Sequence, residues 1–503
     1  MGLQETVDSV ANIFTTKKHG YSAIPEDGQT RNERLSADQR AQGRRFLKFA
    51  MLGVGVTILL MFTMSWGSAS PQRCEWTGNC TDTSPHLWGQ YSPVFSVPSE
   101  ISPDVPEGCE VTFALILSRH GARDPTASKS ELYRALVERI QSSVTHYSVG
   151  FEFLQDFKYS LGSDQLTGFG VQQMTDSGEA FYERYKNLGR DEEPFVRAAG
   201  SQRVVESATN FTKGFYAARG KGGNGAEDEV LVLPEEKGFN NTLNHGTCTA
   251  FERGPASEVR QKMQAVWKSI WVPPIAARLN HFLPGANLTL DETIYMMDLC
   301  PFHTVATPHA ATRSPFCNLF TKDEWRSYDY FMSLDKWYGY GQGNPLGPTQ
   351  GVGWVNELIA RLTGKGVQDG TSTNSTLDGG EETFPLGRKL YADFSHDNLM
   401  ASVHAAMGLY NHTKDLPTGR KVAPGDAGGF SAAWTVPFAA RMYVEKMRCE
   451  GEEQQELVRV IVNDRVVKLE GCEGDEEGRC EVGKFVESLS FAKSGGRWDA
   501  CFT

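Results

Sequence analysis

Three short apolar runs in this chain each lead into charged or polar residues. Residues 111–117 lead into Ser-Arg-His-Gly, residues 194–197 precede a helical stretch that opens at Ser201, and residues 390–394 lead into Ser-His-Asp. Nearly unbroken apolar runs of this length are typical of strands buried on both faces. Polar residues at the carboxyl ends of parallel strands meet at one edge of a sheet. The pattern therefore predicts an α/β fold with a mostly parallel central sheet and one shared site.

The intervening stretches have a different character. Residues of about 130–190 and 245–375 are predicted to be mainly helical or irregular. Near the C-terminus, residues 457–462 and 465–469 flank an Asn-Asp pair, which predicts a β-hairpin.

The N-terminal part of the chain predicts a membrane anchor. Residues 49–66 are an uncharged run, which as a helix spans about 27 Å and suits a transmembrane helix. Basic residues crowd its N-terminal side, at Arg40, Arg44, Arg45 and Lys48. This asymmetry places residues 1–48 in the cytosol as a disordered tail, with residues 67–108 as a stalk and leading loop outside it. We expect a single-pass type II membrane protein whose domain, residues 109–503, is lumenal or extracellular, at the cell surface or in a vacuole. The alternative is cleavage after the apolar run, which would release a secreted protein.

Cysteines, sequons and charge agree with a position outside the cytosol. All ten cysteines follow residue 70 and none forms a C-x-x-C pair, which favours five disulfides over zinc or redox chemistry. Six N-x-[ST] sequons also follow the apolar run and predict a glycoprotein: Asn79, Asn210, Asn240, Asn287, Asn374 and Asn411. A net charge of −12 argues against nucleic-acid binding.

The strongest chemical signal is R-H-G-A-R-D-P at positions 119–125. A lone histidine after a strand is usually structural. Arginines one residue before and three after His120, however, need an anion, and a phosphoryl group fits. Arg197 ends the second apolar run, with Arg203 six residues further on. The alternative for Arg197 is a structural salt bridge.

The sequence does not support the motifs of other enzyme classes. Glycines at 220, 222 and 225 match a dinucleotide-binding pattern by letters, but they follow a helical stretch inside a polar segment. The chain has no G-x-S-x-G, no H-E-x-x-H and no P-loop lysine motif. We predict neither a metal nor another cofactor, because the arginines and a histidine supply the positive charge.

The segments R-H-G-A-R-x-P-T at 119–126 and S-H-D-N at 395–398 resemble the two signatures of the histidine acid phosphatases, and more closely those of the fungal phytases. The likeness covers residues 74–503 and leaves the tail and anchor outside it. It extends through residues 87–93, 159–162, 244–248, 343–353 and 433–438.

The resemblance implies a large α/β domain beside a smaller α-helical domain, with the active site between them. It also implies five disulfides: Cys74–Cys80, Cys109–Cys449, Cys248–Cys501, Cys300–Cys317 and Cys472–Cys480.

Together the motifs predict a phosphomonoesterase that works at acidic pH through a covalent phosphohistidine. We expect His120 to attack phosphorus and protonated Asp397 to donate a proton to the leaving group. The predicted phosphate-binding residues are Arg119, Arg123, Arg197 and His396.

The expected substrate is phytate, myo-inositol hexakisphosphate. The predicted substrate pocket contains Gln90, Lys129, Asp298 and Lys336. Leu132 and Asp335 stand where lysine can occur in the family, which predicts a weaker preference for phytate than in a lysine-rich relative. Two alternatives stay open: a broad-specificity acid phosphatase or inositol polyphosphate phosphatase with the same site, and a non-catalytic surface glycoprotein.

Overall fold

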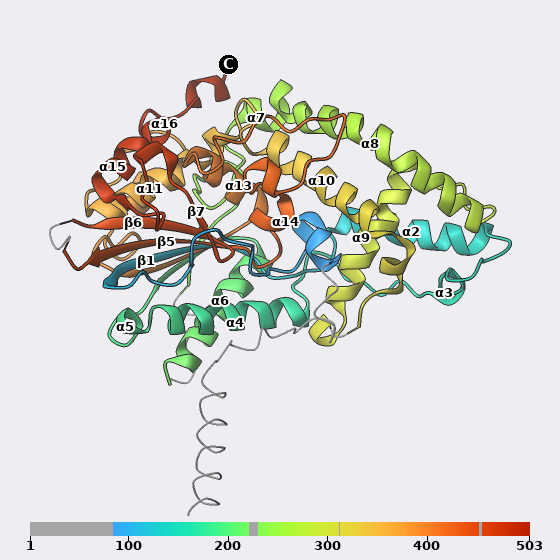
Figure 1. Ribbon diagram of the computed structural model, residues 1–503, viewed down its shortest axis with the longest axis horizontal. Coiled ribbons are helices and arrows are strands. Elements are labelled where there is room, and N and C mark those ends of the chain that lie inside the picture. The colour runs from blue at the N-terminus through green and yellow to red at the C-terminus, as the bar shows by residue number, and fades with distance from the viewer. Residues whose placement is uncertain (1–83, 221–229, 311, 452–454) are drawn as a thin grey trace, which may run out of the picture. The chain divides into compact units, whose positions relative to one another are not determined.

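The first apolar run forms β1 (Cys109–Arg119), a central strand of the sheet (Figure 1). β1 pairs in parallel with β4 (Leu390–Ser395), β4 with β2 (Phe195–Ala199), and β2 with β3 (Val230–Leu233). Every residue of β4 is buried, which is why its sequence is so apolar. The computed structural model describes residues 84–220, 230–310, 312–451 and 455–503.

The other half of the sheet is antiparallel. Its strands are β5 (Arg441–Cys449), β6 (Leu457–Val462), β7 (Arg465–Val467) and β8 (Cys480–Glu481). The predicted hairpin is confirmed, since β6 and β7 are joined by Asn463 and Asp464, whose φ angles of 49° and 66° suit a two-residue turn. The prediction of a mostly parallel sheet is wrong. β5 runs back against β1, and β6 to β8 add by antiparallel pairing, so the sheet is mixed.

Helices cover both faces of the sheet. On one face, α4 (Gly168–Arg184) packs closely against α6 (Gln202–Ala218), and on the other lie α11 (Val352–Thr363) and α13 (Asp397–Ala406) (Figure 1). Near the C-terminus, α15 (Val482–Ser488) and α16 (Ser490–Lys493) complete this second layer. α4 and α11 come from stretches that are predicted to be mainly helical or irregular, and they lie in the layers that cover the sheet.

A second group of helices forms a helical part beside the sheet (Figure 1). Its main helices are α2 (Ala127–Ser143), α3 (Phe153–Asp156), α8 (Pro255–Phe282), α9 (Leu290–Ala306) and α10 (Lys322–Gly339). α9 and α10 begin with capping boxes in which Thr289 pairs with Glu292 and Thr321 with Glu324. α10 contacts both α8 and α13, so it borders the sheet and the helical part.

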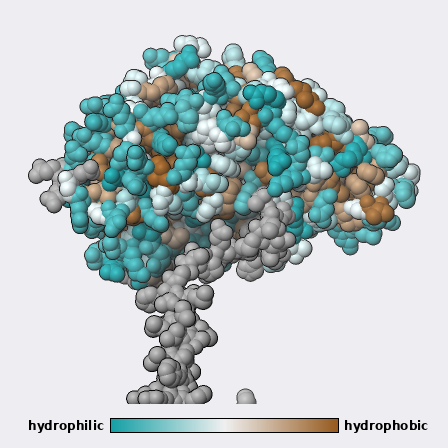
Figure 2. Space-filling view, in the orientation of Figure 1, coloured by the Kyte–Doolittle hydropathy of each residue, from teal (hydrophilic) through white to brown (hydrophobic). Residues whose placement is uncertain are grey.

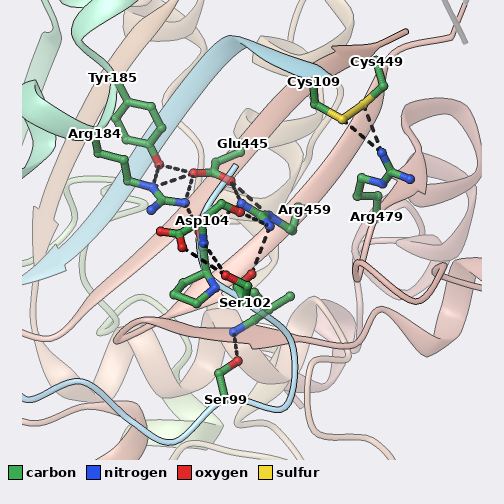
Figure 3. Close-up of polar contacts among 12 residues, drawn as sticks. Ser99, Ser102, Asp104, Cys109, Arg184, Tyr185, Glu445, Cys449, Arg459 and Arg479 are labelled. Carbon is green, nitrogen blue, oxygen red and sulfur yellow. Dashed lines mark hydrogen bonds and ion pairs between the residues drawn. A yellow bond between two sulfur atoms is a disulfide. The ribbon is translucent and has the colours of Figure 1, made fainter. Parts of the chain in front are cut away.

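The described part of the predicted stalk and leading loop, residues 84–108, is packed into the domain. Trp88 is fully buried. Figure 3 shows the buried carboxylate of Glu445 bound by Arg459 and Arg184. These two arginines also donate hydrogen bonds to backbone carbonyls of the leading segment, Arg459 to Asp104 at 2.9 Å and Arg184 to Pro103 at 2.6 Å. The remainder of the predicted stalk, residues 67–83, lies outside the described residues.

Four of the five implied disulfides are confirmed: Cys109–Cys449, Cys248–Cys501, Cys300–Cys317 and Cys472–Cys480. The fifth, Cys74–Cys80, lies outside the described residues.

None of the helices in the described part of the chain has the length and apolarity that crossing a membrane requires. The predicted span, residues 49–66, is not among the described residues. The face in Figure 2 is mostly hydrophilic, with scattered hydrophobic side chains.

Candidate active site

The histidine of the R-H-G motif is held rigidly just beyond the end of β1. His120 is 1% exposed, its backbone N–H donates to the Ser395 carbonyl at 3.1 Å, and its own carbonyl accepts from the Ala439 N–H at 3.0 Å. Its side-chain Nδ1 lies 2.8 Å from the carbonyl oxygen of Gly121. Because a carbonyl can only accept, Nδ1 carries the proton and Nε2 carries the lone pair.

The surroundings keep this imidazole neutral. Burial, reinforced by the positive charges of Arg119 and Arg123, lowers the pKa of His120 well below its ordinary value. These surroundings favour the neutral imidazole, which is the nucleophilic form.

The glycine of the motif is required by a close approach. A Cβ on Gly121 would lie 2.4 Å from the carbonyl oxygen of Gly170, near the start of α4. Side chains of α6 and α4 hold the backbone of the motif in place. Ser207 accepts a hydrogen bond from the N–H of Gly121 at 3.1 Å, and Gln173 accepts one from the N–H of Ala122 at 2.9 Å.

Three guanidinium groups surround the histidine: those of Arg119, Arg123 and Arg203. Burial lowers the pKa of Arg119 to about 10 against the opposing charge of Asp397, and burial followed by repulsion from Arg123 lowers that of Arg203. The Nε atoms of all three are buried and have no hydrogen-bond partner among the described residues. Buried donors of this kind suit an anion such as phosphate.

Arg197 is not part of this group. Its strand position pairs it with Asp393 of β4, which accepts from Nε and Nη2 at 2.9 Å, and Glu357 accepts from Nη2 at 2.6 Å. Nε and Nη2 of its guanidinium are therefore engaged in a buried ion-pair network. Arg203 lies beyond the end of β2, in the first turn of α6, and takes the place at the site that the sequence assigned to Arg197.

The second histidine, His396, has a carboxylate partner that the sequence did not reveal. Its Nε2 lies 2.8 Å from Oε1 of Glu235, so His396 can contact substrate only through Nδ1. Burial lowers the pKa of His396, while Glu235 opposes that shift. Donors from His396 and Ser201 outweigh burial at Glu235 and hold its pKa at about 2. Glu235 follows β3, a strand that the sequence pattern did not predict, and this is why it was missed.

Asp397 is the first residue of α13 and is bound by two cations. Its Oδ2 lies 3.3 Å from Nη2 of Arg119 and 2.9 Å from Nζ of Lys336. Burial would raise the pKa of Asp397, but Arg119 and Lys336 outweigh it and hold the pKa well below its ordinary value. These two cations favour the ionised carboxylate, so the proton donation predicted for Asp397 requires that this carboxylate first gain a proton.

The structure brings Lys336 into the site, and Gln90 borders it through the backbone. The Gln90 carbonyl accepts from Arg119, and Oε1 of its buried side chain has no hydrogen-bond partner among the described residues. Lys336 also donates to Asn398 at 2.7 Å.

The other two predicted pocket residues lie on the helical side. Nζ of Lys129 is 4.3 Å from the ring centre of Tyr295. Asp298 is buried, accepts hydroxyl hydrogen bonds from Tyr133 at 2.7 Å and from Tyr328, and has its pKa raised by burial. These contacts make Asp298 a link between α2, α9 and α10.

Comparison with known proteins places the chain in a phosphatase family. The family model of the histidine phosphatase superfamily (branch 2) matches residues 110–463. The chain is 54% identical to Phytase A of Emericella nidulans over 430 residues, covering 84% of this chain and 92% of that protein. It is 50% identical to Phytase A of Aspergillus oryzae over 460 residues, covering 89% of this chain and 98% of that protein.

Two solved structures share the fold. The phytase from D. castellii matches with a TM-score of 0.68 at 21% identity, covering 84% of this chain and 88% of that one. The multiple inositol polyphosphate phosphatase of Bifidobacterium longum, in complex with inositol hexasulfate, matches with a TM-score of 0.58 at 16% identity, covering 80% of this chain and 97% of that one.

Proposed function

The chain belongs to the histidine phosphatase superfamily (branch 2), and on that premise we propose that it hydrolyses phosphate monoesters, phytate among them, through a phosphohistidine at His120. One observation carries this proposal. The Nδ1–H of His120 is donated to the Gly121 carbonyl, which leaves the Nε2 lone pair of a neutral imidazole near the guanidinium groups of Arg119, Arg123 and Arg203, whose Nε atoms are buried and have no hydrogen-bond partner in the described part of the chain.

Substrate binding begins with the arginines. The non-bridging oxygens of one phosphate accept hydrogen bonds from Arg119, Arg123 and Arg203, whose positive charges also stabilise the transition state. His396 donates from Nδ1 when it is protonated, and Glu235 supports that charged form.

The first chemical step forms the phosphohistidine. Nε2 of His120 attacks phosphorus in line, the bond between phosphorus and the ester oxygen breaks, and the leaving oxygen takes a proton from Asp397. For this, Asp397 must first gain a proton. A phosphate bound to Arg119 partly neutralises the guanidinium charge that stabilises the ionised Asp397 carboxylate. The pKa of Asp397 therefore rises toward its ordinary value.

The second step regenerates the enzyme. Asp397, now ionised, accepts a proton from water as the water oxygen attacks phosphorus, and the phosphorus–Nε2 bond breaks to release inorganic phosphate. The acidic optimum follows from both groups, because Asp397 must be protonated for the first step while His120 must be neutral.

Phytate as substrate is supported by relatives at about half identity that carry the name Phytase A. The direct test compares release of phosphate from phytate and from p-nitrophenyl phosphate by the full chain between pH 3 and 7. We expect turnover of both in acid. Turnover of p-nitrophenyl phosphate without phytate would support the broad acid phosphatase, and turnover of neither would support the non-catalytic glycoprotein.

We also propose that residues 49–66 anchor the catalytic domain on the lumenal or extracellular side of a membrane. The disulfides of the described domain support an oxidising compartment. The full-length protein should stay with membranes after alkaline carbonate extraction and shift in size after endoglycosidase treatment. Recovery of a soluble, N-terminally shortened form would instead support cleavage and secretion.

A further inference from the structure

A row of alternating charges leads away from the reaction centre. Arg119 contacts Asp397 at 3.3 Å, Asp397 contacts Lys336 at 2.9 Å, Lys336 contacts Asp335 at 3.1 Å, and Asp335 contacts Arg260 at 3.4 Å. We call these five residues the charged row. Lys336 and Asp335 come from α10, and Arg260 comes from α8.

Arg260, at the outer end of the charged row, is its most exposed member. The side chain of Arg260 is 33% exposed, whereas those of Arg119, Lys336, Asp335 and Asp397 are 1%, 4%, 13% and 15% exposed. Only Lys336 and Asp335 stand between Asp397 and Arg260. The outer end of the row is therefore an accessible cation close to the groups that handle the reacting phosphate.

The guanidinium of Arg260 is positioned with donors to spare. Its Nη1 contacts Oδ1 of Asp335 and, at 3.1 Å, the hydroxyl of Tyr340, and these are its polar contacts among the described residues. The guanidinium carbon also lies 5.7 Å from the ring centre of Tyr340. A guanidinium has five N–H donors, so Nε and Nη2 retain the paired geometry that matches a phosphate.

We propose that Arg260 binds a second, non-reacting phosphate of a polyphosphorylated substrate, and that Asp335 competes with that phosphate for the same guanidinium. This inference rests on the proposed function, because the first phosphate must occupy the arginines around His120. The remaining phosphates of an inositol polyphosphate must then project from the buried centre toward solvent, where the charged row ends. A small monoester has no second phosphate and gains nothing from Arg260.

The competing explanation is purely electrostatic, namely that Arg260 only neutralises the charge of Asp335. A double-mutant cycle distinguishes this explanation from binding of a second phosphate. The variants are Arg260→Ala, Asp335→Asn and both together, in the full chain. The first readout is the dissociation constant of myo-inositol hexasulfate by calorimetry, which needs no turnover, and the second is kcat/KM for phytate and for p-nitrophenyl phosphate.

We expect Asp335→Asn to tighten hexasulfate binding, and Arg260→Ala to weaken it about tenfold in the Asp335→Asn background. In the same background kcat/KM for phytate should fall in parallel, while that for p-nitrophenyl phosphate changes less than about twofold. If Arg260→Ala has no effect once Asp335 is replaced, the neutralisation explanation is correct and the phosphate contact is wrong.

Lys262→Ala is the matched control. Lys262 lies on the same helix, its side chain is 69% exposed, and it pairs with Glu258 outside the charged row. It removes the same charge, so a loss equal to that of Arg260→Ala would reveal a general charge effect and overturn the proposal. If the wild type turns over neither substrate, the proposed function is refuted. The hexasulfate measurements would still show whether Arg260 binds a second phosphate, because they need no turnover.

Discussion

The Nδ1 of His120 and the carbonyl oxygen of Gly121 lie 2.8 Å apart, and this contact determines which ring nitrogen can react. It fixes the tautomer and leaves Nε2 as the nitrogen with the lone pair. The glycine itself is required by a separate contact, because a Cβ at position 121 would lie 2.4 Å from the carbonyl oxygen of Gly170 at the start of α4.

Replacing His120 with Ala should reduce hydrolysis of any monoester by at least about a thousandfold, because no nucleophile remains. Acid-labile phosphate should be trapped on the wild type after rapid quenching and should be absent from the variant. His281→Ala, which removes an exposed histidine from α8, is the control and should behave as wild type. Substantial turnover by His120→Ala would mean that another group attacks phosphorus.

Replacing Asp397 with Asn should affect poor leaving groups most. Phytate releases an alkoxide that needs a proton, and its hydrolysis should fall by about a hundredfold or more. The p-nitrophenolate ion leaves without help, so the pre-steady-state burst of p-nitrophenol should be nearly retained. Equal losses in both reactions would instead assign Asp397 a structural role at the start of α13.

Arg203 and Arg197 should give opposite phenotypes. Arg203→Ala should lower kcat/KM by about a hundredfold with an unchanged melting temperature, because it removes a donor to the transferring phosphate. Arg197→Ala leaves Asp393 and Glu357 buried without their partner and should cost about 3–5 kcal/mol of unfolding free energy. Calorimetric melting together with steady-state kinetics would separate them. A stable but inactive Arg197→Ala protein would restore the assignment made from the sequence.

This pair also shows how far sequence reasoning reaches. The parallel strands and their polar ends were predictable, because buried strands are continuously apolar and the site follows them. Arg197 was misplaced because its role depends on the register between β2 and β4, which sets it opposite Asp393. Local sequence does not encode that register. Glu235 was missed for a related reason, since β3 has only four residues and no motif marks its end.

Replacing Glu235 with Gln should shift the pH dependence of phosphate binding. Glu235 favours protonated His396, so its loss lowers the pKa of His396 further and reduces the protonated fraction at any given pH. The competitive inhibition constant of inorganic phosphate should therefore begin to rise about one to two pH units lower than in the wild type. Glu236→Gln removes the same charge at the exposed neighbouring residue and should leave the profile unchanged. An unshifted profile for Glu235→Gln would show that His396 does not bind phosphate as a cation.

The last prediction concerns the preference for phytate at the rim of the site. Leu132 is 46% exposed on α2, and Lys129 lies three residues earlier, so the two share one face of the helix. A lysine at 132 would add a second cation beside Lys129. The structure makes this a cleaner change than a lysine at 335, because Asp335 already contacts Arg260 and Lys336, and a third cation there would repel both.

Leu132→Lys should lower KM for phytate up to about fivefold, as expected for an exposed charge interaction. KM for p-nitrophenyl phosphate should not change, and the gain should shrink as salt is raised. Ser142→Lys adds the same charge at the far end of α2 and serves as the control. If Ser142→Lys reproduces the gain, or if both substrates gain equally at low salt, position 132 does not face the substrate and the rim charge does not set the preference.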